Sequence, residues 1–357
     1  MTETATPEIH SGLEHRTELR AAWDALRQQQ PNLRIRDAAH QLNVSEAELL
    51  ATNCGGTVQR LQANWGQLLL KFESLGQVMA LTRNNHAVHE KVGTYHSASV
   101  NGPMGLVVDR DIDLRVFFSH WEYGFAVTEE GKGGVRRSLQ FFNKHGEAVH
   151  KVYLREDSNA AAYDELVSQH RSEDQSGLIE VTEQPITSDR PDAEIDFAGL
   201  YTEWRAMEDT HQFFGLLRKY NVGRLQALRN AEADLARPVA LNAVHRALTI
   251  AAEEQLGIMV FVNSTGVVQI HSGPVERIVV TGPWVNVLDP GFNLHLRQEA
   301  IASAWIVRKP TTDGVVTSLE VFDEAGESIA LMFGERKPGK PELEGWREIV
   351  ARLEAEA

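Results

Sequence analysis

The sequence contains little that would support a disulfide-stapled, metal-cluster or membrane-spanning protein. Cys54 is the only cysteine among 357 residues, which excludes an intramolecular disulfide and any site built from several cysteine ligands. No apolar run approaches the roughly 18 residues that a membrane span requires. The first residues are polar and acidic, and they lack the basic start and apolar stretch of a secretory signal. These absences predict a cytoplasmic protein.

The chain also has fewer basic than acidic residues. The chain has 35 lysines and arginines against 50 aspartates and glutamates, a formal net charge of −15. Such a surface repels nucleic acid and anionic membranes unless basic residues are concentrated locally. We therefore expect neither nucleic-acid binding nor membrane insertion. Hydrophobic residues make up 42% of the chain, which is enough to build a globular core.

The familiar motifs of catalysis and metal binding are missing as well. Fourteen histidines are present, but no His-Glu-x-x-His occurs, and His86 and His89 are three residues apart, so strand alternation places them on opposite faces. The Gly131-Lys-Gly-Gly segment falls in a predicted hairpin turn, not between a strand and a helix, so it does not indicate a phosphate-binding loop. Because no general base accompanies Cys54, we interpret it as a small buried thiol.

The chain contains an internal duplication. Residues 113–149 align without a gap with residues 293–329, at a constant offset of 180, and the same offset pairs Gly102-Pro103 with Gly282-Pro283. Self-similarity at a fixed offset indicates repeated structural units. Nine aligned positions are identical, namely Leu114/Leu294, Val127/Val307, Gly134/Gly314, Val135/Val315, Ser138/Ser318, Leu139/Leu319, Phe142/Phe322, Gly146/Gly326 and Glu147/Glu327.

Hydrophobic periodicity predicts helices early in each half and strands after them. Residues 13–50, interrupted by Pro31, and residues 243–256 show the spacing of amphipathic helices. Short β-branched or aromatic segments separated by turns indicate an antiparallel meander at residues 78–83, 105–108, 114–118, 123–128 and 138–142. Strands follow strands without a long intervening helix. We therefore expect an α+β fold with tandem structural duplication, in which each half has helices and a large, mainly antiparallel β-sheet.

The composition between the two repeats changes to that of a linker. Residues 171–195 are polar and rich in turn formers. We predict an N-terminal α+β repeat over residues 1–178, a linker over residues 179–195, and a C-terminal α+β repeat over residues 196–357.

One histidine stands in a different environment from the others. Five residues are spaced four, three, four and three apart, namely Leu200, Trp204, Met207, His211 and Phe214. A continuous helix would place His211 within this apolar stripe, with Asp209 and Thr210 outside it as solvated residues. An imidazole among apolar side chains is what an axial ligand of haem iron requires. The alternative is a core histidine bonded to a backbone carbonyl. The first half has no histidine at the equivalent positions, so we expect one site, not two.

An arginine in the first half is a second candidate. Alternation along the strand that follows Ile112 places Arg115 and Phe117 on the same face. An arginine beside an aromatic ring can stack on a flat ligand while it donates hydrogen bonds. The alternative is an ion pair with Asp109 or Asp113, because solvated charges are the norm on strand faces.

Three further cations occur where the other half has no basic residue, namely Arg224, Lys309 and Arg336. At the offset of 180, Lys309 is equivalent to Glu129, and at an offset of 178 to 179, Arg224 is equivalent to Glu46 or Ser45. Such cations can neutralise the propionates of haem through charge-assisted hydrogen bonds. The alternative for each of them is a solvated surface position.

These residues lie within longer motifs that resemble the HemS/HmuS/ChuS family of bacterial cytoplasmic haem-utilisation proteins. The likeness spans nearly the whole chain. The motifs that carry it are Leu81–Gly93, Ile112–Trp121, Asp209–Val222 with Arg224–Arg229, and Phe333–Gly339. The resemblance implies a duplicated α+β protein that binds haem between its halves. It also implies that His211 is the proximal iron ligand, that Arg115 is the distal arginine, and that Arg224, Lys309 and Arg336 contact the propionates.

The function expected from this resemblance is that of a haem-binding protein which receives imported haem and traffics it towards degradation and iron release. The expected partners are haem itself, an inner-membrane haem importer, and a haem oxygenase or a reductant. One alternative is a haem-degrading enzyme that opens the ring with electrons from an external donor, with Arg115 as its catalytic residue. A further alternative is a non-catalytic carrier of another apolar ligand. The sequence does not separate these three functions.

Overall fold

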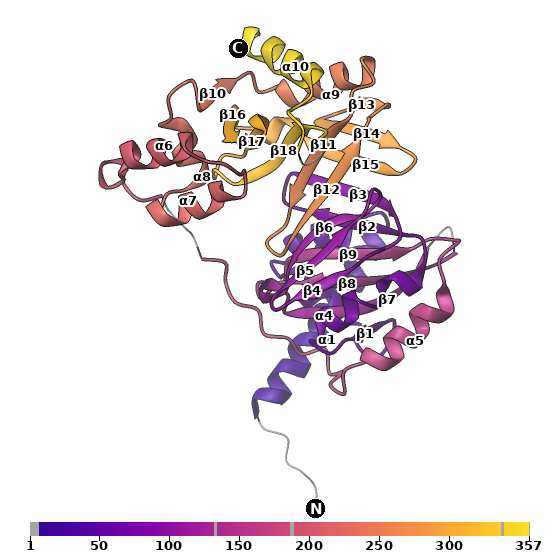
Figure 1. The fold of residues 1–357 in the computed structure, drawn as a ribbon. Helices are drawn as coiled ribbons and strands as arrows, with labels where there is room; N and C mark the ends of the chain where they lie inside the picture. The colour runs from indigo at the N-terminus through magenta and orange to yellow at the C-terminus, as the bar shows by residue number, and fades with distance from the viewer. Residues whose placement is uncertain (1–6, 132–133, 186–188, 337–338, 357) are drawn as a thin grey trace, which may run out of the picture. The chain divides into compact units, whose positions relative to one another are not determined.

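The computed structural model describes residues 7–131, 134–185, 189–336 and 339–356. The chain divides into two compact units (Figure 1). Unit 1 consists of Met1–Thr82, Val92–Pro185 and Ser264–Val267, and unit 2 consists of Arg83–Lys91, Ile186–Asn263 and Val268–Ala357. Each unit therefore includes one short segment from the other half of the sequence. The two segments overlap under the 180-residue offset, so they are equivalent parts of the two repeats.

Unit 1 begins with helices that bury one face, as the apolar spacing predicts. Their order is α1 (Pro7–Gln29), α2 (Ile35–Gln41) and α3 (Glu46–Ala51). Leu19 and Trp23 of α1 pack in one cluster with Leu49 of α3. A capping box starts α3, because the Ser45 side chain accepts from the backbone N–H of Glu48 while the Glu48 carboxylate accepts from the backbone N–H of Ser45.

The strands of unit 1 form antiparallel ladders over an aromatic core. One ladder has the order β1 (Val58–Arg60), β7 (Tyr123–Gly131), β8 (Gly134–Phe142), β9 (Ala148–Leu154) and β2 (Val78–Arg83). The other consists of β4 (Ser99–Asn101), β5 (Met104–Val108) and β6 (Asp113–Phe117). Trp65 of α4 (Trp65–Leu69) packs with Trp121 and Phe141 in the core. The helix α5 (Ala160–His170) lies against this core through Tyr163, Leu166 and Val167.

Unit 2 has the same plan of helices and antiparallel ladders. Its main ladder has the order β10 (Ala236–Val239), β16 (Ser303–Thr311), β17 (Gly314–Phe322), β18 (Ser328–Gly334), β11 (Ile258–Asn263) and β12 (Val267–Gly273). A second ladder contains β13 (Ile278–Thr281), β14 (Trp284–Asp289) and β15 (Phe292–Arg297), which pairs with Ala87–Lys91 of β3 (Ala87–Gly93). The helices are α6 (Phe197–Arg205), α7 (Gln212–Tyr220), α8 (Arg224–Arg229), α9 (Ala243–Glu253) and α10 (Glu344–Ala355).

The backbone confirms the duplication that the sequence predicts. The hairpins β7–β8 and β16–β17 close in the same register, with Gly131 opposite Gly134 and Thr311 opposite Gly314. The turn glycines adopt positive φ at equivalent positions, 102° at Gly134 and 110° at Gly314, a region that only glycine occupies freely. The expected α+β class is therefore confirmed, with strands assembled into two nine-stranded sheets. Lys132 and Gly133 of the Gly131-Lys-Gly-Gly segment lie outside the described residues.

The helices that the sequence analysis did not predict include α5 and α10. α5 and α10 follow the last strand of each main ladder, and their buried residues correspond one to one at an offset of 183: Tyr163/Trp346, Leu166/Ile349, Val167/Val350 and His170/Leu353. The described helices include none long and apolar enough to span a bilayer. Cys54 is buried, as expected, and burial raises the pKa of its thiol to about 11.

Candidate functional site

The helix expected to carry His211 is interrupted just before that residue. Leu200, Trp204 and Met207 are buried as the stripe predicts, but α6 ends at Arg205 and α7 begins only at Gln212. The His211 side chain is 92% exposed, so its predicted place within an apolar helical stripe is wrong. The alternative of a core histidine is wrong for the same reason.

Local polar side chains cause this break in the helix. The Gln212 side-chain oxygen accepts hydrogen bonds from the backbone N–H groups of Glu208 and Asp209, at 2.8 and 3.1 Å. The Asp209 carboxylate accepts from the backbone N–H of His211 at 2.7 Å. Short polar side chains that capture nearby amides compete with the helical hydrogen bonds, and here they turn the chain between the two helices.

The same carboxylate fixes the imidazole of His211. Nδ1 of His211 lies 2.6 Å from Oδ1 of Asp209, and because a carboxylate can only accept, Nδ1 carries the proton. In the neutral ring, Nε2 is therefore the nitrogen that carries the lone pair. The hydrogen bonds from the His211 backbone and ring lower the pKa of Asp209, which keeps the acceptor ionised. The sequence analysis treated Asp209 as an ordinary solvated residue and missed this role, although the Asp-x-His spacing was the available signal.

Immediately after His211, α7 buries an aromatic ring between two cations. Phe213 is 1% exposed and packs on Trp204, with ring centroids 4.5 Å apart. The guanidinium carbon of Arg224 lies 5.1 Å from the Phe213 ring centroid, and Nζ of Lys309 lies 4.9 Å from it. Two of the three predicted propionate contacts thus lie close to the segment that carries His211.

Arg224 and Lys309 share one buried carboxylate, which the sequence analysis did not identify. Glu320 of β17 is fully buried, and it accepts hydrogen bonds from Nε and Nη2 of Arg224, both at 2.7 Å. Nζ of Lys309 donates to Glu320 Oε1 at 2.8 Å and to Ser318 Oγ at 3.3 Å. We call Arg224, Lys309 and Glu320 the cation triad. With all three groups ionised it carries one uncompensated positive charge.

The charges within the cation triad shift the pKa values of its members. Burial alone would raise the pKa of Glu320, but Arg224 and Lys309 outweigh it and hold the carboxyl pKa far below its usual range. Burial lowers the pKa of Lys309 to about 8, with Arg224 acting in the same direction and Glu320 opposing it. At neutral pH the triad is therefore mostly in its cationic state.

Arg336, the third predicted cation, follows β18 and lies close enough to Asp209 to influence that carboxylate. It is half-buried, and its Nε is buried without a hydrogen-bond partner among the described residues. Its charge contributes to the lowered pKa of Asp209, the partner of His211. Lys337 and Pro338 of the Phe333–Gly339 motif lie outside the described residues. Unit 2 thus carries an exposed imidazole, the cation triad and an unsatisfied buried arginine donor.

In unit 1, Arg115 and Phe117 alternate with buried residues along β6, as predicted. Leu114 and Val116 are fully buried, whereas Arg115 and Phe117 are partly exposed on the other face. Nη1 of Arg115 forms an ion pair with Asp113, which is the partner offered by the alternative interpretation. The distal role of Arg115 stays a prediction.

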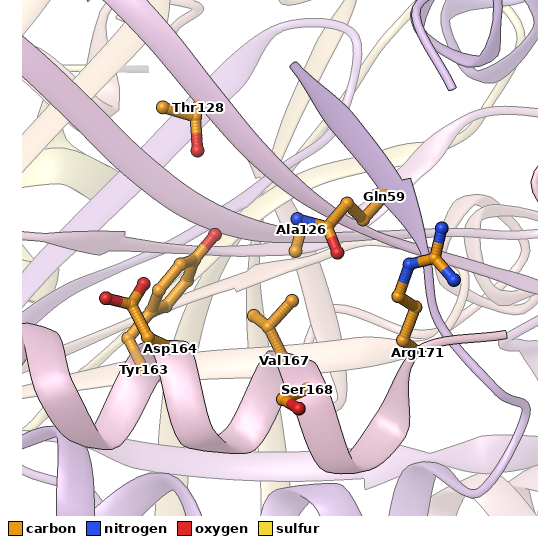
Figure 2. Close-up of a pocket in the computed structure, with 8 residues that line it drawn as sticks. All are labelled: Gln59, Ala126, Thr128, Tyr163, Asp164, Val167, Ser168 and Arg171. Carbon is orange, nitrogen blue, oxygen red and sulfur yellow. The ribbon is translucent and has the colours of Figure 1, made fainter. Parts of the chain in front are cut away.

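A cavity in unit 1 contains none of the predicted site residues. It has a volume of about 270 Å³ and lies between α5 and the strands β1 and β7 (Figure 2). This volume is below the roughly 300–1,000 Å³ of typical small-molecule sites. Its lining residues are Gln59, Ala126, Thr128, Tyr163, Asp164, Val167, Ser168 and Arg171.

Comparisons with known proteins agree with the motifs in the sequence. A family model described as "Haemin-degrading HemS.ChuX domain" matches residues 43–170 and 221–353. The hemin transport protein HmuS of Yersinia pestis is 43% identical over 324 residues, which cover 90% of this chain and 93% of HmuS. The crystal structure of holo-PhuS, a heme-binding protein from Pseudomonas aeruginosa, is 46% identical, with a TM-score of 0.92 over 95% of this chain and 99% of PhuS. The heme degrading enzyme ChuS of Escherichia coli O157:H7 is 38% identical, with a TM-score of 0.89 over 95% of this chain and 99% of ChuS.

Proposed function

Because the chain belongs to the HemS.ChuX family of haemin-degrading domains, we propose that it binds haem through His211 and passes it on within a bacterial haem-utilisation route. One observation carries the proposal. His211 is exposed and its Nδ1 proton is held by Asp209, which leaves Nε2 as the nitrogen that can ligate iron, and Phe213 of the same segment packs against Arg224 and Lys309. A neutral imidazole held through its second nitrogen is the usual arrangement of a metal-ligating histidine.

The residues of unit 2 fit the chemistry of haem. The buried Nε of Arg336, which has no hydrogen-bond partner in the described ranges of the chain, and the surplus charge of the cation triad suit a ligand that carries carboxylates. Phe213 buries its ring beside these cations, and Phe214 exposes 65% of its surface next to it, which offers an apolar contact. Burial of the macrocycle would contribute about 25 cal/mol per Å² of apolar area. When bound, haem supplies a redox-active iron with a coordination position for a sixth ligand.

The role that we propose for Asp209 can be tested without any turnover. Asp209→Asn removes the anionic acceptor of the His211 Nδ1 proton and weakens the basicity of the ligand. We expect haem affinity to fall about tenfold and the iron–histidine stretching band of the ferrous complex to move to lower frequency. Resonance Raman spectroscopy and haem titration measure both effects. Glu208→Gln, an exposed neighbour in the same loop, serves as the control, and an unchanged band in Asp209→Asn would contradict the proposal.

For Arg115 and Phe117 we propose a distal role, in which the arginine would donate hydrogen bonds to a small ligand of the haem iron and the ring would contact the macrocycle. The ion pair with Asp113 orients the guanidinium and leaves its other nitrogens as donors. Arg115→Ala is expected to change the absorption spectrum of the bound haem with less than about a tenfold loss of affinity. Arg110→Ala, which removes the same charge from the exposed loop before β6, is the matched control. Identical spectra of the two variants would argue against the distal role.

Whether the protein also degrades haem is the second candidate function, and the similarity to ChuS, a heme degrading enzyme, supports it. In that case Arg115 acts as the catalytic residue. The haem complex should then consume oxygen with an electron donor and, with catalase present, form a linear tetrapyrrole. A carrier would leave the macrocycle intact and deliver it to a haem oxygenase. A binding protein for another apolar ligand would give no haem absorption shift at all.

A further inference from the structure

In each repeat, the first residue of an equivalent short helix forms an ion pair with the sheet, but its charge is negative in the first repeat and positive in the second. α3 and α8 each span six residues and start 178 residues apart, so Glu46 and Arg224 are equivalent first residues. In unit 1, Glu46 pairs with Lys151 of β9, and both side chains are buried. In unit 2, Arg224 pairs with Glu320 of β17. The position equivalent to Glu320 in the first repeat holds Gln140.

The exchange leaves different charges in the two units. The pair of Glu46 and Lys151 is neutral, whereas the cation triad has two positive charges on one carboxylate. Lys309 replaces Glu129, whose carboxylate in unit 1 is exposed and paired with Arg136. The surplus charge is therefore a property of the second repeat and not of the shared fold.

We propose that Glu320 is a positioning residue that makes unit 2 selective for ligands with a free carboxylate, because it holds Arg224 in one orientation and keeps Lys309 charged. The inference rests on the proposed function, since it assumes that the ligand is a tetrapyrrole acid. Burying an anion beneath two cations costs solvation free energy, which the two ion pairs and a hydrogen bond from the Ser318 hydroxyl offset. A neutral side chain would fill the position at lower cost, as Gln140 does in the first repeat.

The geometry shows how Glu320 orients the arginine. Both of its oxygens are engaged by the Nε–Nη2 edge of Arg224, a fork arrangement that fixes the plane of the guanidinium. The Arg224 side chain is 27% exposed, and among the described residues Nη1 has no protein partner. The remaining edge of the guanidinium is thus available to a carboxylate from outside, with no further loss of side-chain entropy.

Glu320 also controls the charge on Lys309. Nζ of Lys309 is faced by Glu320 from β17, by the Arg224 guanidinium from α8, and by the rings of Phe213 and Phe333 from α7 and β18. Glu320 is the anion of this set, and the burial of Lys309 and the nearby Arg224 both favour the neutral amine. Without Glu320, we expect the pKa of Lys309 to fall below 8, so that the lysine loses its proton near neutral pH.

The first test uses the ligand-free protein, so it does not depend on haem. The ¹³Cε chemical shift of Lys309 is followed against pH in wild type, Glu320→Gln and the control Glu299→Gln, whose carboxylate is exposed and paired with Arg297. We expect a midpoint near 8 in wild type and in the control, and a midpoint at least one pH unit lower in Glu320→Gln. An unchanged midpoint in folded Glu320→Gln would overturn the inference.

The second test compares hemin with its dimethyl ester, which lacks the free carboxylates. Wild type should bind the acid about tenfold more tightly than the ester at pH 7, and Glu320→Gln should lose most of this preference. If Glu320→Gln does not fold, Glu320→Asp, which keeps the charge, should retain the preference, and Lys309→Gln, which leaves the Arg224–Glu320 pair neutral, should lose it. Equal preference in all folded variants refutes the inference. If wild type binds neither compound, the proposed function fails, while the first test still decides the charge on Lys309.

Discussion

Replacing His211 with alanine is expected to abolish the absorption spectrum of histidine-ligated haem and to weaken haem binding by about a hundredfold or more. Loss of an outer-shell partner of a metal ligand typically costs 10–100-fold in affinity, and loss of the ligand itself should cost at least as much. The fold should not change, because the His211 side chain is 92% exposed and, among the residues that the structure describes, hydrogen-bonds to Asp209 alone, a neighbour in the same loop. Titration with hemin, followed by absorption spectroscopy, measures the effect.

His40→Ala is the matched control for this experiment. His40 is an exposed histidine in the last turn of α2, in unit 1, and it belongs to none of the proposed contacts. Its removal should leave spectrum and affinity as in wild type. If His211→Ala retains the wild-type spectrum, another residue ligates the iron and the proposed site is wrong. If neither His211→Ala nor His40→Ala shifts the absorption of hemin, the ligand is not haem.

Lowering the pH from 6.5 to 4 is expected to cost several kcal/mol of the free energy of unfolding, because three histidines are buried in their neutral form. Burial lowers the pKa of His150 and of His271 to about 3, and it holds the pKa of His89 well below its usual value. In the unfolded chain each imidazole takes up a proton near pH 6.5, while the folded protein resists protonation down to much lower pH. Acid therefore favours the unfolded state by up to about 1.4 kcal/mol per pH unit for each histidine.

The surroundings of these histidines explain why they resist protonation. His150 lies between the hydroxyls of Thr82 and Tyr95, with Nδ1 2.9 Å from Thr82 and Nε2 2.6 Å from Tyr95. His271 stacks on Phe292 with ring centroids 3.8 Å apart, and Nζ of Lys91 lies 3.3 Å from its Nδ1. Within the described part of the chain, neither ring has a carboxylate as hydrogen-bond partner, so a second proton finds no compensation for lost hydration.

Urea unfolding at pH 7, 6, 5 and 4 measures this dependence. His150→Gln provides the matched variant, because its amide can hydrogen-bond to both hydroxyls but does not titrate. Its stability should be lower at pH 7, and it should fall less steeply with acid by the contribution of one histidine. A variant that loses stability as steeply as wild type would show that His150 does not contribute. Acid also removes the contribution of Glu320 to the free energy of unfolding, but this loss begins only as the pH falls below about 4.5.

The relation between the repeats could be found from the sequence because it depends on local backbone requirements. Gly134 and Gly314 adopt positive φ in the same hairpin turn, and Gly146 and Gly326 do so in the next one. Positions with this constraint accept few other residues, so they reveal equivalent turns directly. The continuous helix through His211 could not be excluded in the same way, because apolar spacing says nothing about polar side chains that capture backbone amides.

The cation triad depends on contacts between residues that lie far apart in the sequence. Arg224 and Glu320 are 96 residues apart, and no periodicity relates a helix start to the middle of a strand in a different part of the chain. Comparison of the halves singled out Arg224 and Lys309 as differences, but it gave no sign that one buried carboxylate joins them. That carboxylate occupies a position where the first repeat has glutamine.

The sequence by itself determined the α+β class, the duplication, and the identity of the imidazole and cations that distinguish the second half, because these follow from short-range spacing and from residue chemistry. Only the tertiary structure decided that His211 is exposed, that Asp209 holds its ring, and that Glu320 lies beneath two cations. Exposure and charge pairing depend on which segments the fold brings together. Burial then determines how much solvation free energy each charged group loses.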